Sequence, residues 1–155
     1  MKKDYDDFVE GINKVKKLVS IFNTNVQKKI ALYMWDYVRD HLDELHDMLT
    51  EEEIDSGDVV DYGYVVVESI KQHFCEKLDK DTGLVVDWDN YCILCHQYEK
   101  ISRGKPCDMC PLKSCAETSE NPYHTLVEYA FHKKNKNDAL SAIYTITKAI
   151  KGAVL

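Results

Sequence analysis

Motifs that mark common enzyme classes are absent from this sequence. It has no glycine-rich phosphate-binding loop, no H-E-x-x-H motif and no G-x-S-x-G motif, and it contains only six glycines. A zinc-dependent deaminase needs a glutamate two residues after an upstream histidine or cysteine ligand, and neither His73 nor Cys75 has one. We therefore expect a protein that is not an enzyme.

Arginine and long apolar segments are also scarce. The chain has 18 lysines but only two arginines, Arg39 and Arg103, whereas proteins that read nucleic-acid sequence rely on arginine for bidentate contacts. No apolar run approaches the length of a membrane span, and nothing after Met1 resembles a signal peptide. These absences predict a soluble, cytoplasmic protein with no membrane partner.

Acidic residues are concentrated in one part of a chain whose net charge is −7. Between Asp36 and Asp61 there are eleven acidic residues and one basic residue, Arg39. Such a surface repels a phosphate backbone and attracts a basic protein. A solvated helix face carries the same kind of charge run, so both interpretations are open from the sequence.

The spacing of apolar residues predicts a mainly α fold in one domain, residues 1–155. Intervals of three and four residues from about residue 4 to 22 and from 24 to 49 predict two helices packed as an antiparallel hairpin or bundle. The valine-rich run from Val59 to Leu78 is too long for a usual strand, so we expect a helix there, with Cys75 buried or half-buried beside its apolar face. The second helix has a predicted apolar seam of Val26, Ile30, Tyr33, Tyr37, His41 and Leu45, widened by Met34, Val38 and Leu42.

Several residues mark the ends of these helices. Thr50 and Glu53 have the spacing of a capping box, and Pro122 suits the first position of a helix. Residues 79–83 have the composition of a turn, 84–86 that of a short strand or extended segment, and 133–137 that of a polar break before a final helix. The chain thus divides into an acidic helical part (1–80), a cysteine module (88–123) and C-terminal helices (122–155).

The cysteine module carries the clearest chemical signal. Cys92 and Cys95 form one C-x-x-C pair, and after eleven intervening residues Cys107 and Cys110 form another. Two such pairs supply four thiolates to a tetrahedral site, which predicts a closed, structural Zn²⁺ site on a knuckle-like loop. Other residues could replace one of the four ligands, namely Cys115, His96 and His124.

Other cysteine chemistry is also possible for this module. An iron–sulfur cluster is the main alternative, because Cys110 is followed by Pro111 and Cys115 offers a spare thiolate. Disulfides need an oxidising compartment, and a redox C-x-x-C needs a βαβ setting that the sequence does not predict. Zinc therefore remains the favoured interpretation, with the iron–sulfur cluster as the alternative.

The module resembles part of a group of small, uncharacterised cysteine-rich proteins of bacteriophages and bacteria. The resemblance covers about 32 of the 155 residues and rests on C-x-L-C-x-x-Y, C-x-x-C-P, a further cysteine and Pro-Tyr before a helix. Asn121 stands where those proteins usually have threonine. The resemblance implies a metal module in a bacterial or phage-infected cell, and no activity common to the group. The residues that carry it run from Cys92 to Tyr98, from Cys107 to Leu112, Cys115, and Pro122 with Tyr123.

Two functions fit these features. The first is a zinc-stabilised helical protein whose acidic surface binds a host or phage protein, as a host-takeover or anti-defence factor would. The second is a single-stranded nucleic-acid binder that uses aromatic and basic residues around the knuckle. The candidate contacts for this second function are Tyr91, Tyr98, Lys100, Arg103 and Lys105.

Overall fold

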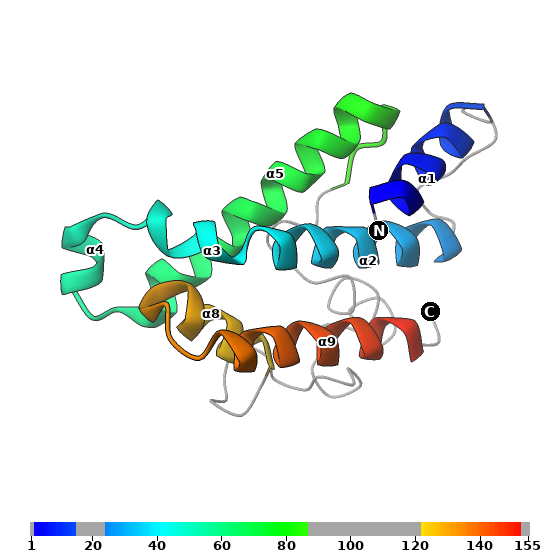
Figure 1. Ribbon diagram of the computed structural model, residues 1–155. Coiled ribbons are helices and arrows are strands. Elements are labelled where there is room, and N and C mark those ends of the chain that lie inside the picture. The colour runs from blue at the N-terminus through cyan, green and yellow to red at the C-terminus, as the bar shows by residue number, and fades with distance from the viewer. Residues whose placement is uncertain (1, 15–23, 87–121, 153–155) are drawn as a thin grey trace, which may run out of the picture.

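The computed structural model describes residues 2–14, 24–86 and 122–152. These ranges are mainly helical and contain no strand, which confirms the predicted mainly α class (Figure 1). Within them, no helix is long and apolar enough to cross a membrane. The elements are α1 (Lys2–Lys14), α2 (Thr24–Asp40), α3 (Leu42–Leu45), the 3₁₀ helix η1 (His46–Met48), α4 (Glu51–Asp55), the π-helix η2 (Val59–Gly63), α5 (Tyr64–Thr82), α8 (Pro122–His132) and α9 (Lys136–Gly152).

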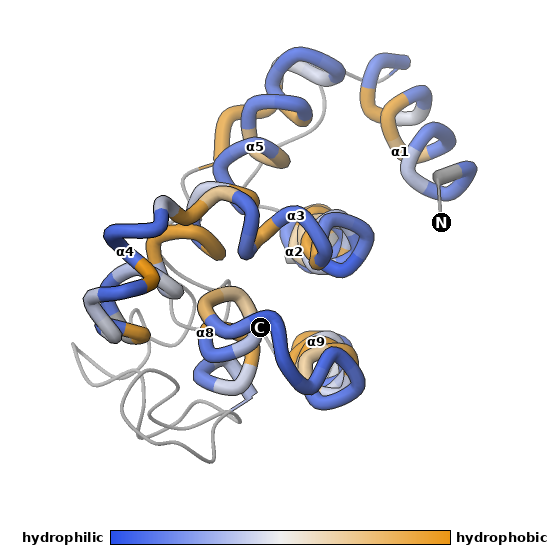
Figure 2. Tube along the Cα trace, turned by 60° about the vertical axis from the view of Figure 1, so that its left-hand side comes forward, coloured by the Kyte–Doolittle hydropathy of each residue, from blue (hydrophilic) through white to orange (hydrophobic). Residues whose placement is uncertain are grey.

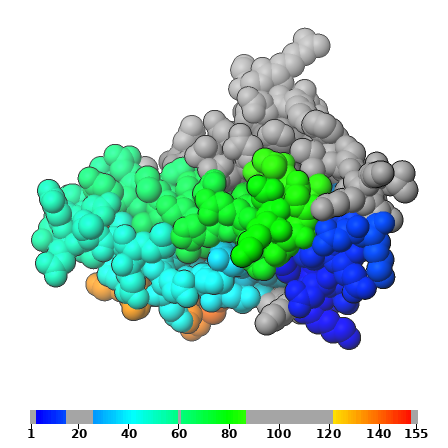
Figure 3. All heavy atoms as spheres, turned by 90° about the horizontal axis from the view of Figure 1, so that it is seen from above, coloured from blue at the N-terminus to red at the C-terminus, as the bar shows by residue number. Residues whose placement is uncertain are grey.

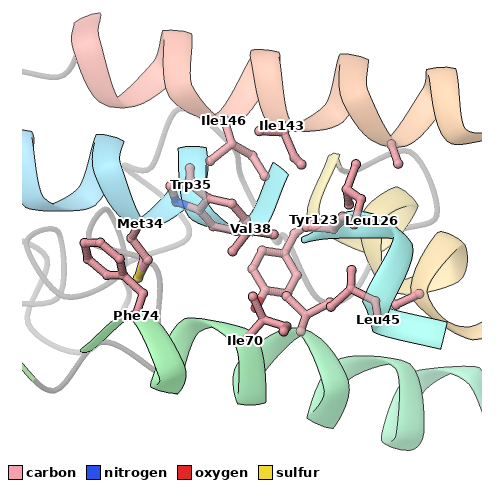
Figure 4. Close-up of a cluster of buried hydrophobic side chains, with 14 of the residues drawn as sticks. Met34, Trp35, Val38, Leu45, Ile70, Phe74, Tyr123, Leu126, Ile143 and Ile146 are labelled. Carbon is pink, nitrogen blue, oxygen red and sulfur yellow. The ribbon is translucent and has the colours of Figure 1, made fainter. Parts of the chain in front are cut away.

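Helix α2 lies at the centre of the described core, with α5 and α9 packed against it (Figures 1 and 4). Met34, Trp35 and Val38 have no exposed surface. The predicted seam was only partly right, because Tyr33 and Tyr37 are half-buried while Trp35, which the seam omitted, is fully buried. Contacts on more than one side bury a wider arc of α2 than a simple hairpin would.

Helix α1 contacts both α2 and α5. The Tyr5 ring lies 5.5 Å from the Tyr33 ring of α2 and 6.0 Å from the Phe74 ring of α5, measured between centroids. Tyr5 Oη donates a hydrogen bond to Asp81 Oδ2 at 3.0 Å. The predicted pairing of α1 with α2 is therefore only part of its packing.

The predicted second helix does not continue unbroken to residue 49. It ends at Asp40, where His41 takes a non-helical conformation (φ −111°, ψ 16°) before α3 begins. His41 Nδ1 lies 2.7 Å from the Tyr37 carbonyl oxygen, and the two rings stack with centroids 4.0 Å apart. The change in direction still allows Leu42 and Leu45 to be buried.

Thr50 begins α4 with the predicted capping box. Its hydroxyl accepts a hydrogen bond from Glu53 N at 3.2 Å, and Glu53 Oε1 accepts one from Thr50 N at 3.0 Å. Gly57 then turns the chain with φ +71°. A methyl group at Gly63 would lie 2.6 Å from the Val127 carbonyl oxygen, so this glycine allows α8 to approach η2 closely.

The helix predicted from Val59 to Leu78 is confirmed as helical structure, but its first residues form the π-helix η2, and α5 begins at Tyr64 and ends later than expected. Helix α5 continues through the predicted turn to Thr82 and ends at Gly83, whose φ of 76° is left-handed. Cys75 on this helix is buried, as expected. Pro122 begins α8 as predicted, and the polar break before α9 is shorter than expected because α9 already begins at Lys136.

Candidate functional site

The predicted thiolate ligands Cys92, Cys95, Cys107 and Cys110 lie outside the described residues, as do Cys115 and His96. The predicted nucleic-acid contacts, which run from Tyr91 to Lys105, lie outside them too. In ranges 2–14, 24–86 and 122–152, no group of three or more His, Cys, Asp or Glu side chains could hold a metal ion. The zinc site thus remains a prediction from the sequence.

His124 is the one proposed metal ligand whose position is described. It lies in the first turn of α8, and its side chain is 18% exposed. Its Nε2 lies 3.3 Å from Glu128 Oε1, one helical turn further along. A metal ion bound through Nε2 would have to displace this carboxylate contact.

The described residues next to the cysteine module pack against one core. On the N-terminal side, Leu84 and Val86 are partly buried and packed against the core, while Val85 is 64% exposed. On the C-terminal side, Tyr123 at the start of α8 is buried. Helices α5 and α8 also contact each other, so the module leaves and rejoins the same packed scaffold.

A buried polar cluster links the start of α8 to α5. Lys71 Nζ lies 3.4 and 3.5 Å from the two carboxylate oxygens of Glu68, and the lysine side chain has no exposed surface. Tyr123 Oη donates a hydrogen bond to Glu68 Oε1. These contacts compensate two charges that would otherwise be costly to bury.

Aromatic rings enclose the lysine of this cluster. Lys71 Nζ lies 5.7 Å from the centroid of the Trp35 ring and 5.5 Å from that of Tyr123, within the range of cation–π attraction. The two rings meet edge to face, with centroids 5.8 Å apart (Figure 4). Trp35 Nε1 is buried without a hydrogen-bond partner among the described residues. The cluster fixes α8, and with it the end of the cysteine module, against α2 and α5.

The sequence contained a signal for this cluster that the apolar-seam analysis missed. Lys71 lies four residues after Val67 and three before Phe74, both of which are buried. It therefore occupies a position on the apolar face of α5, and Glu68 lies one turn earlier. A charged pair at such positions predicts a buried ion pair.

Seven acidic side chains between α3 and η2 form a surface without described counter-charges. Asp36, Asp40, Asp43 and Asp47 have a basic nitrogen within 4 Å, from Arg39, Lys136 or Lys133. No such ion pair is described for the other acidic residues between Asp36 and Asp61. We call these seven the acidic surface: Glu44, Glu51, Glu52, Glu53, Asp55, Asp58 and Asp61.

The charges of the acidic surface affect one another. Asp58 raises the pKa of Asp61 through a side-chain hydrogen bond and through charge repulsion. Figure 1 shows α4 at one end of the molecule and α1 toward the other, and the same separation is visible in Figure 3. Most of the acidic surface thus lies toward the α4 end of the described structure, where a basic partner would gain from contact.

Comparison with known proteins does not assign a function. No family model matches the chain, and no curated protein or solved structure matches it either. A function is therefore inferred from the chain's own residues.

Proposed function

We propose that this chain is a non-enzymatic, zinc-stabilised helical protein that binds another protein through its acidic surface. The observation that carries the proposal is the concentration of seven acidic side chains with no described ion pair at one end of the molecule. Charge of one sign on a surface accelerates association with an oppositely charged partner and disfavours nucleic acid. The partner should accordingly present a basic patch.

Zinc has a structural role in this proposal. Cys92, Cys95, Cys107 and Cys110 have the spacing of a closed tetrathiolate site, which leaves no coordination position for substrate. The scaffold supports that role, because α5 before the module and α8 after it contact each other in one core. The resemblance to cysteine-rich phage and bacterial proteins further suggests a host-takeover or anti-defence factor that works in the cytoplasm.

The proposal is tested by affinity capture from nuclease-treated bacterial lysate with three forms of the full chain. The first is the wild type, and the second is Asp55→Lys/Asp61→Lys, which reverses two charges of the acidic surface. The third is Glu76→Lys/Asp79→Lys, which makes the same charge change at exposed positions of α5. We expect a partner that the wild type and the α5 variant retain and the acidic-surface variant loses.

Two results would contradict this function. Equal capture of the partner by all three forms would show that the acidic surface is not the binding site. Tight, salt-dependent binding of single-stranded oligonucleotides with no protein partner would instead support the nucleic-acid function predicted for residues around the knuckle.

A further inference from the structure

A groove of about 970 Å³ lies between α1, α2 and α9. Figure 2 views α2 and α9 nearly end-on, with α1 above α2 and α9 below it. Helix α2 forms the floor of the groove, and its lining residues extend from Val26 to Arg39. At 1.5 Å per residue that floor is about 20 Å long, which matches three to four turns of a helix.

Apolar side chains from all three helices reach the groove. Phe8 and Ile12 line it from α1, Leu32 from α2 and Tyr144 from α9. Tyr144 is 67% exposed, although it lies on a helix whose other face is buried in the core. Helix α2 also contributes charged residues to the floor, namely Lys29 and the paired Asp36 and Arg39. A phenol ring that stands this far out of a helix beside the apolar side chains of the groove is suited to contact a partner.

The two walls of the groove carry opposite charges. Asp4 and Asp7 lie on the α1 wall, whereas Lys148 and Lys151 lie on the α9 wall. Asp7, Lys148 and Lys151 are exposed, and none of them forms an ion pair within the described part of the chain. The orientation of α1 is fixed in part by Tyr33 Oη, which donates a hydrogen bond to the Asp4 carbonyl oxygen at 3.1 Å.

We propose that this groove binds one amphipathic helix of a partner protein. The occupant is specified by charge complementarity: its apolar stripe faces Phe8, Leu32 and Tyr144. Basic residues on one flank face Asp7, and acidic residues on the other flank face Lys148 and Lys151. A helix laid in a groove makes this kind of contact through residues at i, i+3, i+4 and i+7. The opposite charges of the two walls also fix the direction of the bound helix. Reversing the helix would place its basic flank against the basic wall and its acidic flank against the acidic wall.

This site is separate from the acidic surface and goes beyond the proposed function. Helix α1 and helix α4 lie at opposite ends of the molecule (Figures 1 and 3). The groove could therefore bind its helix whether or not the acidic surface has a partner. The Asp55→Lys/Asp61→Lys variant separates the two sites, since it should leave helix binding in the groove unchanged.

The test begins with selection from a displayed library of 18-residue helical peptides against the full chain. We expect enriched peptides to share an apolar stripe, a basic flank and an acidic flank. Labelled copies of the enriched peptides are then titrated against variants by fluorescence anisotropy. Tyr144→Ala should weaken binding about tenfold, as the loss of an aromatic contact at an interface does.

Charge-reversal variants test the orientation of the bound helix. Asp7→Lys and Lys148→Glu should each weaken binding about threefold to tenfold at low salt, and less at high salt. A peptide whose basic flank is changed to glutamate should regain binding to Asp7→Lys. Lys134→Glu is the matched control, because Lys134 is exposed and does not line the groove, so it should leave affinity unchanged.

Three outcomes would overturn the proposal. The first is the absence of enriched peptides, and the second is enriched peptides whose affinity is unaffected by the groove variants. The third is a wild-type dimer in sedimentation equilibrium that Tyr144→Ala dissociates, which would show that a second copy of this chain occupies the groove.

Discussion

Lys71 and Glu68 form an ion pair inside the helical core, with Lys71 Nζ 3.4 Å from Glu68 Oε1. The lysine side chain has no exposed surface, and the glutamate side chain is 11% exposed. Removing one partner of a buried pair leaves an uncompensated charge, whereas replacing both partners by uncharged groups can be nearly neutral. The pair therefore ties α5 to Tyr123 of α8 and makes their packing specific.

Breaking this pair should be costly, and removing both charges should be less so. We expect Lys71→Met to lower the free energy of unfolding by about 3 kcal/mol, and Glu68→Gln/Lys71→Met to recover part of that loss. Urea unfolding followed by circular dichroism measures these two variants and Glu68→Gln alone, with exposed Lys80→Met on the same helix as the control. A double variant as unstable as the sum of the two single variants would contradict this account of the pair.

The close approach of α8 to η2 depends on Gly63. In Gly63→Ala the new methyl would lie 2.6 Å from the Val127 carbonyl oxygen and 2.9 Å from Val127 Cγ1, so backbone has to move. Overpacking of this kind costs about 1–3 kcal/mol. Gly11→Ala is the matched control, because nothing lies within 4 Å of its added methyl and alanine favours the helix by about 0.5–1 kcal/mol.

The two substitutions should therefore move thermal stability in opposite directions. The melting temperature of Gly63→Ala should fall, and that of Gly11→Ala should stay the same or rise. If Gly63→Ala had the same melting temperature as the wild type, α8 would not contact η2 as closely as the structure shows.

The hydrogen bonds that Asp81 accepts from Lys77 of α5 and Tyr5 of α1 should make the stability of the fold depend on pH in acidic solution. Lys77 donates a hydrogen bond to Asp81 Oδ2 at 2.8 Å and lowers the pKa of Asp81 below its usual value of 3.8, assisted by the hydrogen bond from Tyr5. A carboxyl whose pKa is lower in the folded state stabilises the fold above its unfolded-state pKa. That contribution is lost as pH falls through the folded-state value.

Asp81→Asn isolates this contribution. The variant should be less stable than the wild type at pH 7, and the difference should shrink as pH falls below about 3.8. Thermal unfolding at a series of pH values measures it, with Asp79→Asn, at an exposed position in the last turn of α5, as the control. A stability difference that stayed constant down to pH 2 would show that the Asp81 charge is not responsible.

The sequence predicted helices well where a local signal determined them. The capping box at Thr50 and the first position of Pro122 depend on neighbouring residues alone, and both were confirmed. The turn expected at residues 79–83 was wrong, because Thr82 is buried and its hydroxyl bonds back to the Leu78 carbonyl oxygen at 2.7 Å, so the helix continues to Gly83. Amino-acid composition alone does not show that tertiary packing buries Thr82 in the last turn of the helix.

Features that depend on several distant helices were harder to predict. The burial of Trp35 needs α5, α8 and α9 around α2, and the groove needs α1 and α9 on either side of it. Neither follows from the spacing of apolar residues along one helix. The proposed zinc ligands differ from these features, because they lie close together in the sequence. Their spacing predicts a metal site without any knowledge of the fold.

Metal content is the measurement that tests the cysteine module itself. We expect about one zinc per chain by mass spectrometry of anaerobically purified protein with no visible colour, because four thiolates hold a d¹⁰ ion without absorbing visible light. Cys107→Ser and Cys110→Ser should lose zinc and melt at lower temperature, since structural zinc contributes folding energy. Cys75→Ala is the control, because Cys75 lies on α5, outside the proposed ligand set, so zinc should be retained. Iron with sulfide and a brown colour would instead establish the iron–sulfur alternative, and wild-type metal content in both serine variants would refute these ligands.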